Sequence, residues 1–151
     1  MKLKNVLLAF LTLSVLVIGC KKDDEPSAEE VAKNRFSKTW NITKVTLSPN
    51  TDYNFNPPVT YTFGSDGTFT STNAEALPKA DSPQRFMPAT GTWAFQDGSN
   101  YKTVLLKKTG ETDVALTITA LEDNKLVVTY DGAEPKETDQ VTVTVEATPA
   151  S

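Results

Sequence analysis

The chain of 151 residues has no histidine and only one cysteine, and each shortage removes a class of chemistry. Without histidine, the chain can form neither a Ser-His-Asp or Cys-His catalytic group nor a histidine-ligated zinc or copper site. One cysteine can form neither an internal disulfide bond nor a metal site with several thiolates. The net charge of −4 also lacks the basic excess of a nucleic-acid-binding domain. We therefore predict no catalytic residue, no cofactor, no metal and no nucleic-acid partner.

The first 19 residues have the pattern of a secretory signal peptide. Lys2 and Lys4 precede an almost unbroken apolar run over residues 6–18. A basic start followed by an apolar run of ~7–15 residues is typical of such signals. The run is too short for a membrane-spanning helix, which needs ~20 apolar residues.

The end of this segment, LVIGC at residues 16–20, resembles the lipobox of bacterial lipoproteins. The resemblance implies cleavage after Gly19, a diacylglyceryl group on the sulfur of Cys20, and acylation of the new amine of Cys20. Two or three acyl chains anchor a protein stably, because each buried CH₂ contributes ~0.8 kcal/mol. The alternative is an ordinary secretion or membrane signal with an incidental cysteine. We expect a protein that is held in the outer membrane by the lipid on Cys20.

A charged stretch, KKDDE at residues 21–25, follows that cysteine. It resembles the signal that sends some lipoproteins to the cell surface, and the alternative is a solvated tether, because charged runs resist compaction. Without residues 1–19 the chain has 132 residues, with 19 acidic and 13 basic side chains and a net charge of −6. An anionic membrane repels such a domain. We expect residues 20–26 to be a tether and the protein to be exposed at the cell surface.

The folded domain is predicted to span residues 27–148 and to begin with a short helix. Ser27 can cap this helix, and Glu30, three residues later, completes the pattern of a capping box. Apolar residues then recur at helical spacing as far as Phe36. We expect this helix of roughly ten residues to cover one end of the structure that follows it.

From residue 39 the sequence changes to short alternating segments rich in threonine, valine and aromatic residues, which suit strands. Eight strands are predicted: Thr39–Leu47, Val59–Phe63, Thr68–Thr72, Thr92–Gln96, Tyr101–Lys107, Val114–Ala120, Lys125–Tyr130 and Gln140–Glu146. A change in the phase of the apolar residues predicts a bulge near Thr43. Most connections are short, which favours antiparallel neighbours in sequence order and hence an up-and-down barrel.

Three sequence motifs resemble those of a known protein family. They are FSKTWNI at 36–42, YTFGSDGTF at 61–69 and GTWAF at 91–95. In this order they resemble the lipocalin-like domains of short bacterial outer-membrane lipoproteins, over roughly residues 36–145. The resemblance implies an all-β fold, an eight-stranded antiparallel up-and-down (lipocalin-like) barrel, here with a short N-terminal helix.

Two long connections, residues 48–58 and 73–90, carry apolar side chains that short hairpins do not need. Loops of this length often form lids or binding sites. Tyr53 and Phe55 in the first, with Phe86 and Met87 in the second, are the candidate ligand-binding residues. These four side chains either rim the mouth of the barrel and contact a ligand, or fold back and fill the barrel.

Other conspicuous side chains have two interpretations each. Trp40 and Trp93 lie on inward phases, where a core role is favoured over contact with a ligand. Four acids beside turn residues are explained by turn chemistry, and their number in any one loop is too low for a calcium site. These acids are Asp66, Asp97, Asp123 and Asp131.

The sequence favours two functions. The first is a lipid-anchored, non-enzymatic binding module whose barrel holds a small apolar or amphipathic ligand. The second is an accessory or interaction subunit of an outer-membrane complex, with a barrel that is filled by its own side chains. An eight-stranded barrel has room for side chains or for one small ligand. The state of the interior therefore separates the two functions.

Overall fold

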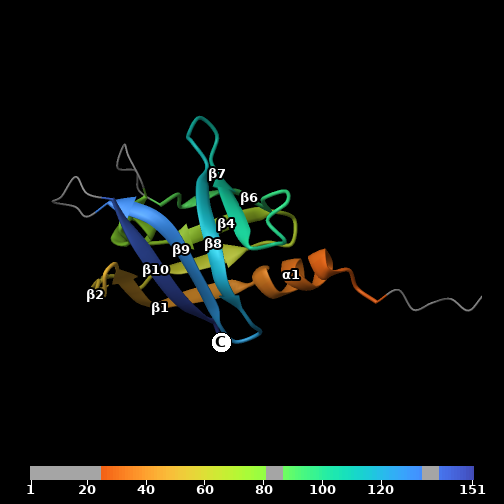
Figure 1. Cartoon of the computed structure of the whole chain (residues 1–151), viewed down its shortest axis with the longest axis horizontal. Helices are drawn as coiled ribbons and strands as arrows, with labels where there is room; N and C mark the ends of the chain where they lie inside the picture. The colour runs from red at the N-terminus through yellow and green to blue at the C-terminus, as the bar shows by residue number, and fades with distance from the viewer. Residues whose placement is uncertain (1–24, 81–86, 134–139) are drawn as a thin grey trace, which may run out of the picture.

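One short helix precedes a closed antiparallel barrel of eight strands (Figure 1). The computed structural model describes residues 25–80, 87–133 and 140–151. Helix α1 covers Ala28–Phe36. The barrel strands are β1 (Thr39–Leu47), β3 (Thr60–Phe63), β4 (Thr68–Thr72), β6 (Thr90–Phe95), β7 (Thr103–Lys107), β8 (Val114–Leu121), β9 (Leu126–Ala133) and β10 (Gln140–Pro149). Two further strands of two residues each are β2 (Thr51–Asp52), which pairs with β1, and β5 (Lys79–Ala80), which pairs with β9.

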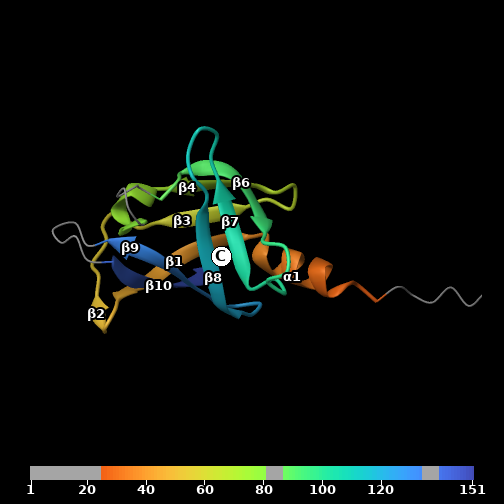
Figure 2. The same cartoon turned by 45° about the horizontal axis from the view of Figure 1, so that its top comes forward.

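The barrel closes because β10 pairs on one side with β9 and on the other with β1. All other barrel neighbours are consecutive along the chain, in the order β1, β3, β4, β6, β7, β8, β9 and β10. Every one of these pairings is antiparallel. Figure 2 shows the strands wrapping around one interior, with α1 beside one end. The predicted all-β, eight-stranded up-and-down barrel with an N-terminal helix is therefore confirmed.

Helix α1 begins as its sequence predicts. The Ser27 hydroxyl accepts a hydrogen bond from the Glu30 backbone N–H at 3.2 Å, and the Glu30 carboxylate accepts one from the Ser27 N–H at 2.8 Å. These two bonds satisfy donors that the first turn of a helix otherwise leaves unpaired. The helix ends at Phe36, whose side chain is fully buried.

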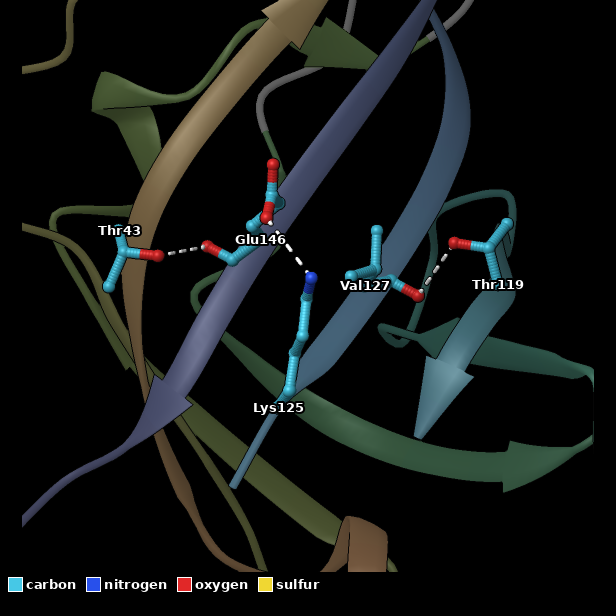
Figure 3. A network of polar contacts seen from close by, with 5 residues as sticks. All are labelled: Thr43, Thr119, Lys125, Val127 and Glu146. Atoms are coloured by element: carbon cyan, nitrogen blue, oxygen red, sulfur yellow. Dashed lines mark hydrogen bonds and ion pairs between the residues drawn. The ribbon is translucent and has the colours of Figure 1, made fainter. Parts of the chain in front are cut away.

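Two bulges bend the barrel wall, and a threonine stabilises each (Figure 3). The pairing of β1 with β10 shifts at Thr43, whose hydroxyl donates to the Glu146 carbonyl oxygen at 3.1 Å. The pairing of β8 with β9 shifts at Thr119, whose hydroxyl donates to the Val127 carbonyl oxygen at 3.2 Å. The predicted bulge in β1 is confirmed, and the one in β8 is a further bulge that the regular alternation of its sequence concealed.

The two ends of the barrel differ in their connections. The end beside α1, here called the helix end, carries the short turns at 64–67, 96–102 and 122–125. Helix α1 is tied to it by an ion pair between Arg35 and Asp123 at 3.3 Å, and the ammonium of Lys38, which follows the helix, donates to the Asp123 carbonyl oxygen at 3.1 Å. The opposite, loop end carries the connections at 48–59 and 73–89. Within the described ranges, no helix is long and apolar enough to cross a membrane.

Candidate functional site

The interior of the barrel is filled by its own side chains. The internal cavity found among the described residues measures about 30 Å³ and is lined mainly by apolar groups. A single water needs ~10–15 Å³ of such space, whereas small-molecule sites measure ~300–1,000 Å³. The lining residues are Phe36, Trp40, Ile42, Tyr61, Phe63, Leu77, Met87, Leu106, Leu116, Leu126, Val128, Tyr130, Val145 and Ala147. The cavity has room for one or two waters.

Helix α1 closes the helix end of this interior with its last residue. The Phe36 ring lies with its centroid 4.4 Å from that of Phe63 and 4.9 Å from that of Trp93. The Trp40 indole N–H donates to the Phe36 carbonyl oxygen at 3.0 Å, which fixes the end of the helix against β1. Such buried aromatic pairs contribute ~0.5–1.5 kcal/mol beyond the area they bury.

Two tyrosines fix Pro78 and Pro88, in the connection from β4 to β6 at the loop end. The Tyr130 hydroxyl donates to the Pro78 carbonyl oxygen at 2.7 Å, beside the short 3₁₀ helix Ala74–Ala76. The Tyr61 hydroxyl donates to the Pro88 carbonyl oxygen at 3.2 Å. Burial is the main cause that raises the pKa of both tyrosines, because it disfavours the phenolate. The polar tips of these interior residues are therefore engaged in holding the loop in place.

The three candidate ligand-binding residues that the structure describes do not lie together. Met87 is 5% exposed and lines the internal cavity, so it fills the barrel. Tyr53 and Phe55 are half-buried and border a shallow recess of about 420 Å³ beside β1. Phe86 and the expected lipidation site Cys20 lie outside the described residues.

Both tryptophans belong to the core. Trp40 is fully buried, and Trp93 is 5% exposed. The Trp93 indole N–H donates to the Gly64 carbonyl oxygen at 3.0 Å, in the turn between β3 and β4. The core role that the sequence favours for these residues agrees with their burial.

A larger recess, here called the helix-end groove, lies outside the barrel between α1 and the connection from β6 to β7. It measures about 470 Å³, within the range of small-molecule sites. Its lining residues are Glu29, Lys33, Gly67, Trp93, Ala94, Phe95, Gln96, Asp97, Gly98, Asn100 and Tyr101. The floor is aromatic, because Phe95 packs edge to face against Trp93 at 5.6 Å between ring centroids.

The polar side chains of this groove are unengaged. Four of them make no hydrogen bond or ion pair with another residue of the described ranges: Glu29, Gln96, Asp97 and Asn100. The charge of Lys33 acts on Asp66, which lies in the neighbouring turn from β3 to β4. Hydrogen bonds from the Thr68 N–H and hydroxyl lower the pKa of that carboxyl, and the Lys33 charge lowers it further. The groove therefore offers donors and acceptors that the fold itself does not use.

A tight turn presents Tyr101 to the groove. Asn100 and Tyr101 both have positive φ, 51° and 62°, and the Lys102 N–H donates to the Ser99 carbonyl oxygen at 3.1 Å. Positive φ at both central residues is the signature of a type I′ turn, in which glycine is strongly preferred at the second of them. An L-residue there costs ~1–2 kcal/mol. The ring that this backbone conformation positions packs edge to face on Phe95, with ring centroids 5.5 Å apart.

The sequence pattern did not indicate this groove. It predicted that a strand begins at Tyr101, whereas β7 begins at Thr103, and turn formation alone explained Asp97. The difference has a physical reason: the left-handed pair at residues 100 and 101 continues the turn, so two residues cannot join the ladder. The available signal was Asn100, a residue type that tolerates a left-handed backbone.

Among the residues that the structure describes, no group of three or more acidic, histidine or cysteine side chains could hold a metal ion. No known protein-family model matches the chain, and no curated protein is similar to it in sequence. The geometry of the barrel and of its surface is therefore the basis for assigning a function.

Proposed function

We propose that the chain is a lipid-anchored, non-enzymatic outer-membrane protein that works through contacts made by its outer surface, as an accessory or interaction subunit. The observation that carries this proposal is the internal cavity of about 30 Å³. A small apolar ligand would have to displace side chains such as Met87 and Leu77, which are both about 95% buried. Of the two functions expected from the sequence, the filled barrel supports the second.

The anchor is part of the proposal and rests on the sequence LVIGC. Lipidation at Cys20 leaves seven residues before α1 starts after Ser27, and a fully extended chain spans at most ~3.6 Å per residue. The helix end would then lie within about 25 Å of the lipid. The loop end would face away from the membrane, toward partners. We also propose the lipocalin-like relationship, on the three motifs and the barrel topology together.

The most suitable contact region at the loop end is the recess beside β1. Tyr53 and Phe55 offer partly exposed aromatic surface there, and amphipathic rings of this kind are enriched at protein interfaces. The rim is polar, with Lys44 and Asp52 paired at 3.2 Å. This combination of an aromatic centre and a charged rim suits a protein partner.

Photo-crosslinking in intact cells tests this function. A photoreactive residue replaces Asn54, which borders the recess, and a matched control replaces Lys108, which is exposed in the connection from β7 to β8. We expect a discrete crosslinked partner of the outer membrane from position 54 and not from position 108. Monomer alone from both positions contradicts the proposal.

Metabolic labelling with palmitate tests the anchor separately. The unaltered chain is expected to be labelled, and Cys20→Ala is expected to lose all label and to accumulate as precursor or leave the membrane. Ser37→Ala, which keeps the LVIGC sequence intact, serves as the control. Label that persists in Cys20→Ala contradicts lipidation at that residue.

A further inference from the structure

We propose that the helix-end groove is a binding site for a neutral saccharide, with the Tyr101 ring against the CH face of a sugar and the surrounding side chains bonded to its hydroxyls. This function lies beyond the proposed role as an interaction subunit. It does not depend on the lipid anchor, since all the residues involved lie on α1, on the barrel strands and in their connections.

The unused polar groups indicate a ligand with many hydroxyls. Gln96 and Asn100 each present an amide that can donate and accept, while Glu29 and Asp97 present carboxylates that accept only. Hydrogen bonds from a hydroxyl to a carboxylate are charge-assisted and short. A saccharide supplies donors and acceptors around its whole edge, so it can satisfy this mixture.

The aromatic floor of the groove indicates that the same ligand also has an apolar face. Phe95 and Tyr101 are both half-buried at the groove, and their rings are held by edge-to-face contacts with Trp93 and with each other. A ring that is fixed by packing presents apolar surface at little cost in conformational entropy. The CH face of a sugar is apolar, whereas its edge is polar. An aromatic surface surrounded by free hydrogen-bonding groups is complementary to both.

The charges disfavour an ionic ligand. The groove combines two carboxylates, Glu29 and Asp97, with one ammonium, that of Lys33. The resulting charge repels anions such as phosphate. It is also too small and too exposed to capture a cation strongly in salt, because exposed charges are screened. A neutral ligand fits this balance best.

The left-handed backbone conformation of Tyr101 supports a role of this residue in binding as well as in folding. Glycine would occupy the second central position of this turn without strain, yet the chain places a tyrosine there. Residues held in sparsely populated backbone regions cluster at ligand sites, where the strain orients a functional group. Replacing Tyr101 by glycine therefore separates the two roles, because it relieves the backbone and removes the ring.

The test uses the full chain purified in detergent, a glycan array, and calorimetric titration with maltose, cellobiose, lactose and N,N′-diacetylchitobiose. Phosphocholine is the ionic probe. We expect saturable binding of at least one neutral saccharide with a dissociation constant of about 1 mM or tighter. Binding of no glycan, or of phosphocholine in place of every saccharide, overturns the proposal.

Variants then locate the site. Tyr101→Gly is expected to weaken binding about tenfold or more while the melting temperature stays the same or rises, and Tyr101→Phe, which keeps the ring, is expected to weaken it less than about threefold. Asp97→Asn is expected to weaken binding several-fold. The same change at Asp131, an exposed carboxylate outside the groove, is the control. Wild-type affinity in both Tyr101→Gly and Asp97→Asn overturns the proposal.

Discussion

The interior of the barrel and the helix-end groove use the same residue types in opposite ways. In the interior, the hydroxyls of Tyr61 and Tyr130 each have a backbone acceptor, and about 30 Å³ of space remains. In the groove, which measures about 470 Å³, polar side chains have no partner among the described residues, and Tyr101 stands on a strained turn. One region uses its polar groups for folding, and the other leaves them free.

This difference in how the polar groups are used indicates that a ligand binds to the outer surface of such a barrel and not in its interior. Buried polar groups without partners are costly, so most of them are paired in native folds. Among the described residues, the buried hydroxyls of Ser37 and Ser71 are the exceptions. Free polar groups at the surface cost nothing in stability and remain available to a ligand. Substitutions should therefore reduce stability when made in the interior and binding when made in the groove.

The largest expected effect is that of Phe36→Ala on stability. Phe36 is fully buried and packs on Phe63 and Trp93, so its truncation should cost ~3–5 kcal/mol in free energy of unfolding. Phe95→Ala, at the half-buried floor of the groove, should cost less than about half as much, in proportion to the area buried. Urea denaturation measures both. Equal losses in free energy of unfolding for Phe36→Ala and Phe95→Ala would contradict the distinction between a structural interior and a binding groove.

The second-largest expected effect is a loss of folding stability at alkaline pH, caused by two tyrosines of the interior. The raised pKa of Tyr61 and Tyr130 in the folded state means that the unfolded chain releases these protons first, from about pH 10. Their contribution to stability is complete below pH 10 and is lost as the pH rises above it, by about 3 kcal/mol for both groups between pH 9 and 11. Urea titrations across this range measure the loss. The double variant Tyr61→Phe/Tyr130→Phe should show a much smaller pH dependence, and an unchanged dependence would refute this assignment.

Tyr130→Phe alone should have a moderate effect at neutral pH. It leaves the buried Pro78 carbonyl without its hydrogen bond, at a cost of ~1–3 kcal/mol. Tyr101→Phe removes a hydroxyl for which no partner is found in the described ranges, so its stability should stay within about 0.5 kcal/mol of the unaltered chain. Thermal melting of the two variants side by side provides the comparison. A larger loss in Tyr101→Phe would show that the groove hydroxyl is structural.

The smallest expected effect on stability is that of Asp97→Asn. The Asp97 side chain is exposed and makes no ion pair within the described ranges, so the free energy of unfolding should change by less than about 0.5 kcal/mol. Urea denaturation checks this value. A loss of more than about 1 kcal/mol would mean that the carboxylate supports the turn, as the sequence alone suggested.

The sequence predicted the fold well because the necessary signals are local. The capping box at Ser27 depends on residues three apart, and the bulge at Thr43 is visible as a change of phase within one strand. The filling of the barrel is not local. Whether Met87 enters the interior depends on contacts with strands distant in sequence, such as the bond from the Tyr61 hydroxyl to the neighbouring Pro88 carbonyl oxygen. The groove depends on a left-handed backbone at Tyr101, for which that residue type gives no warning.

Native mass spectrometry of the purified full chain, incubated with oleate and then freed of detergent by activation in the gas phase, tests the central claim most directly. The claim is that the interior is closed and that binding takes place outside it. We predict the mass of the chain with any covalent lipid and no retained oleate or other apolar small molecule. A stoichiometric apolar molecule that survives activation would contradict the claim, because an internal space of about 30 Å³ cannot enclose one.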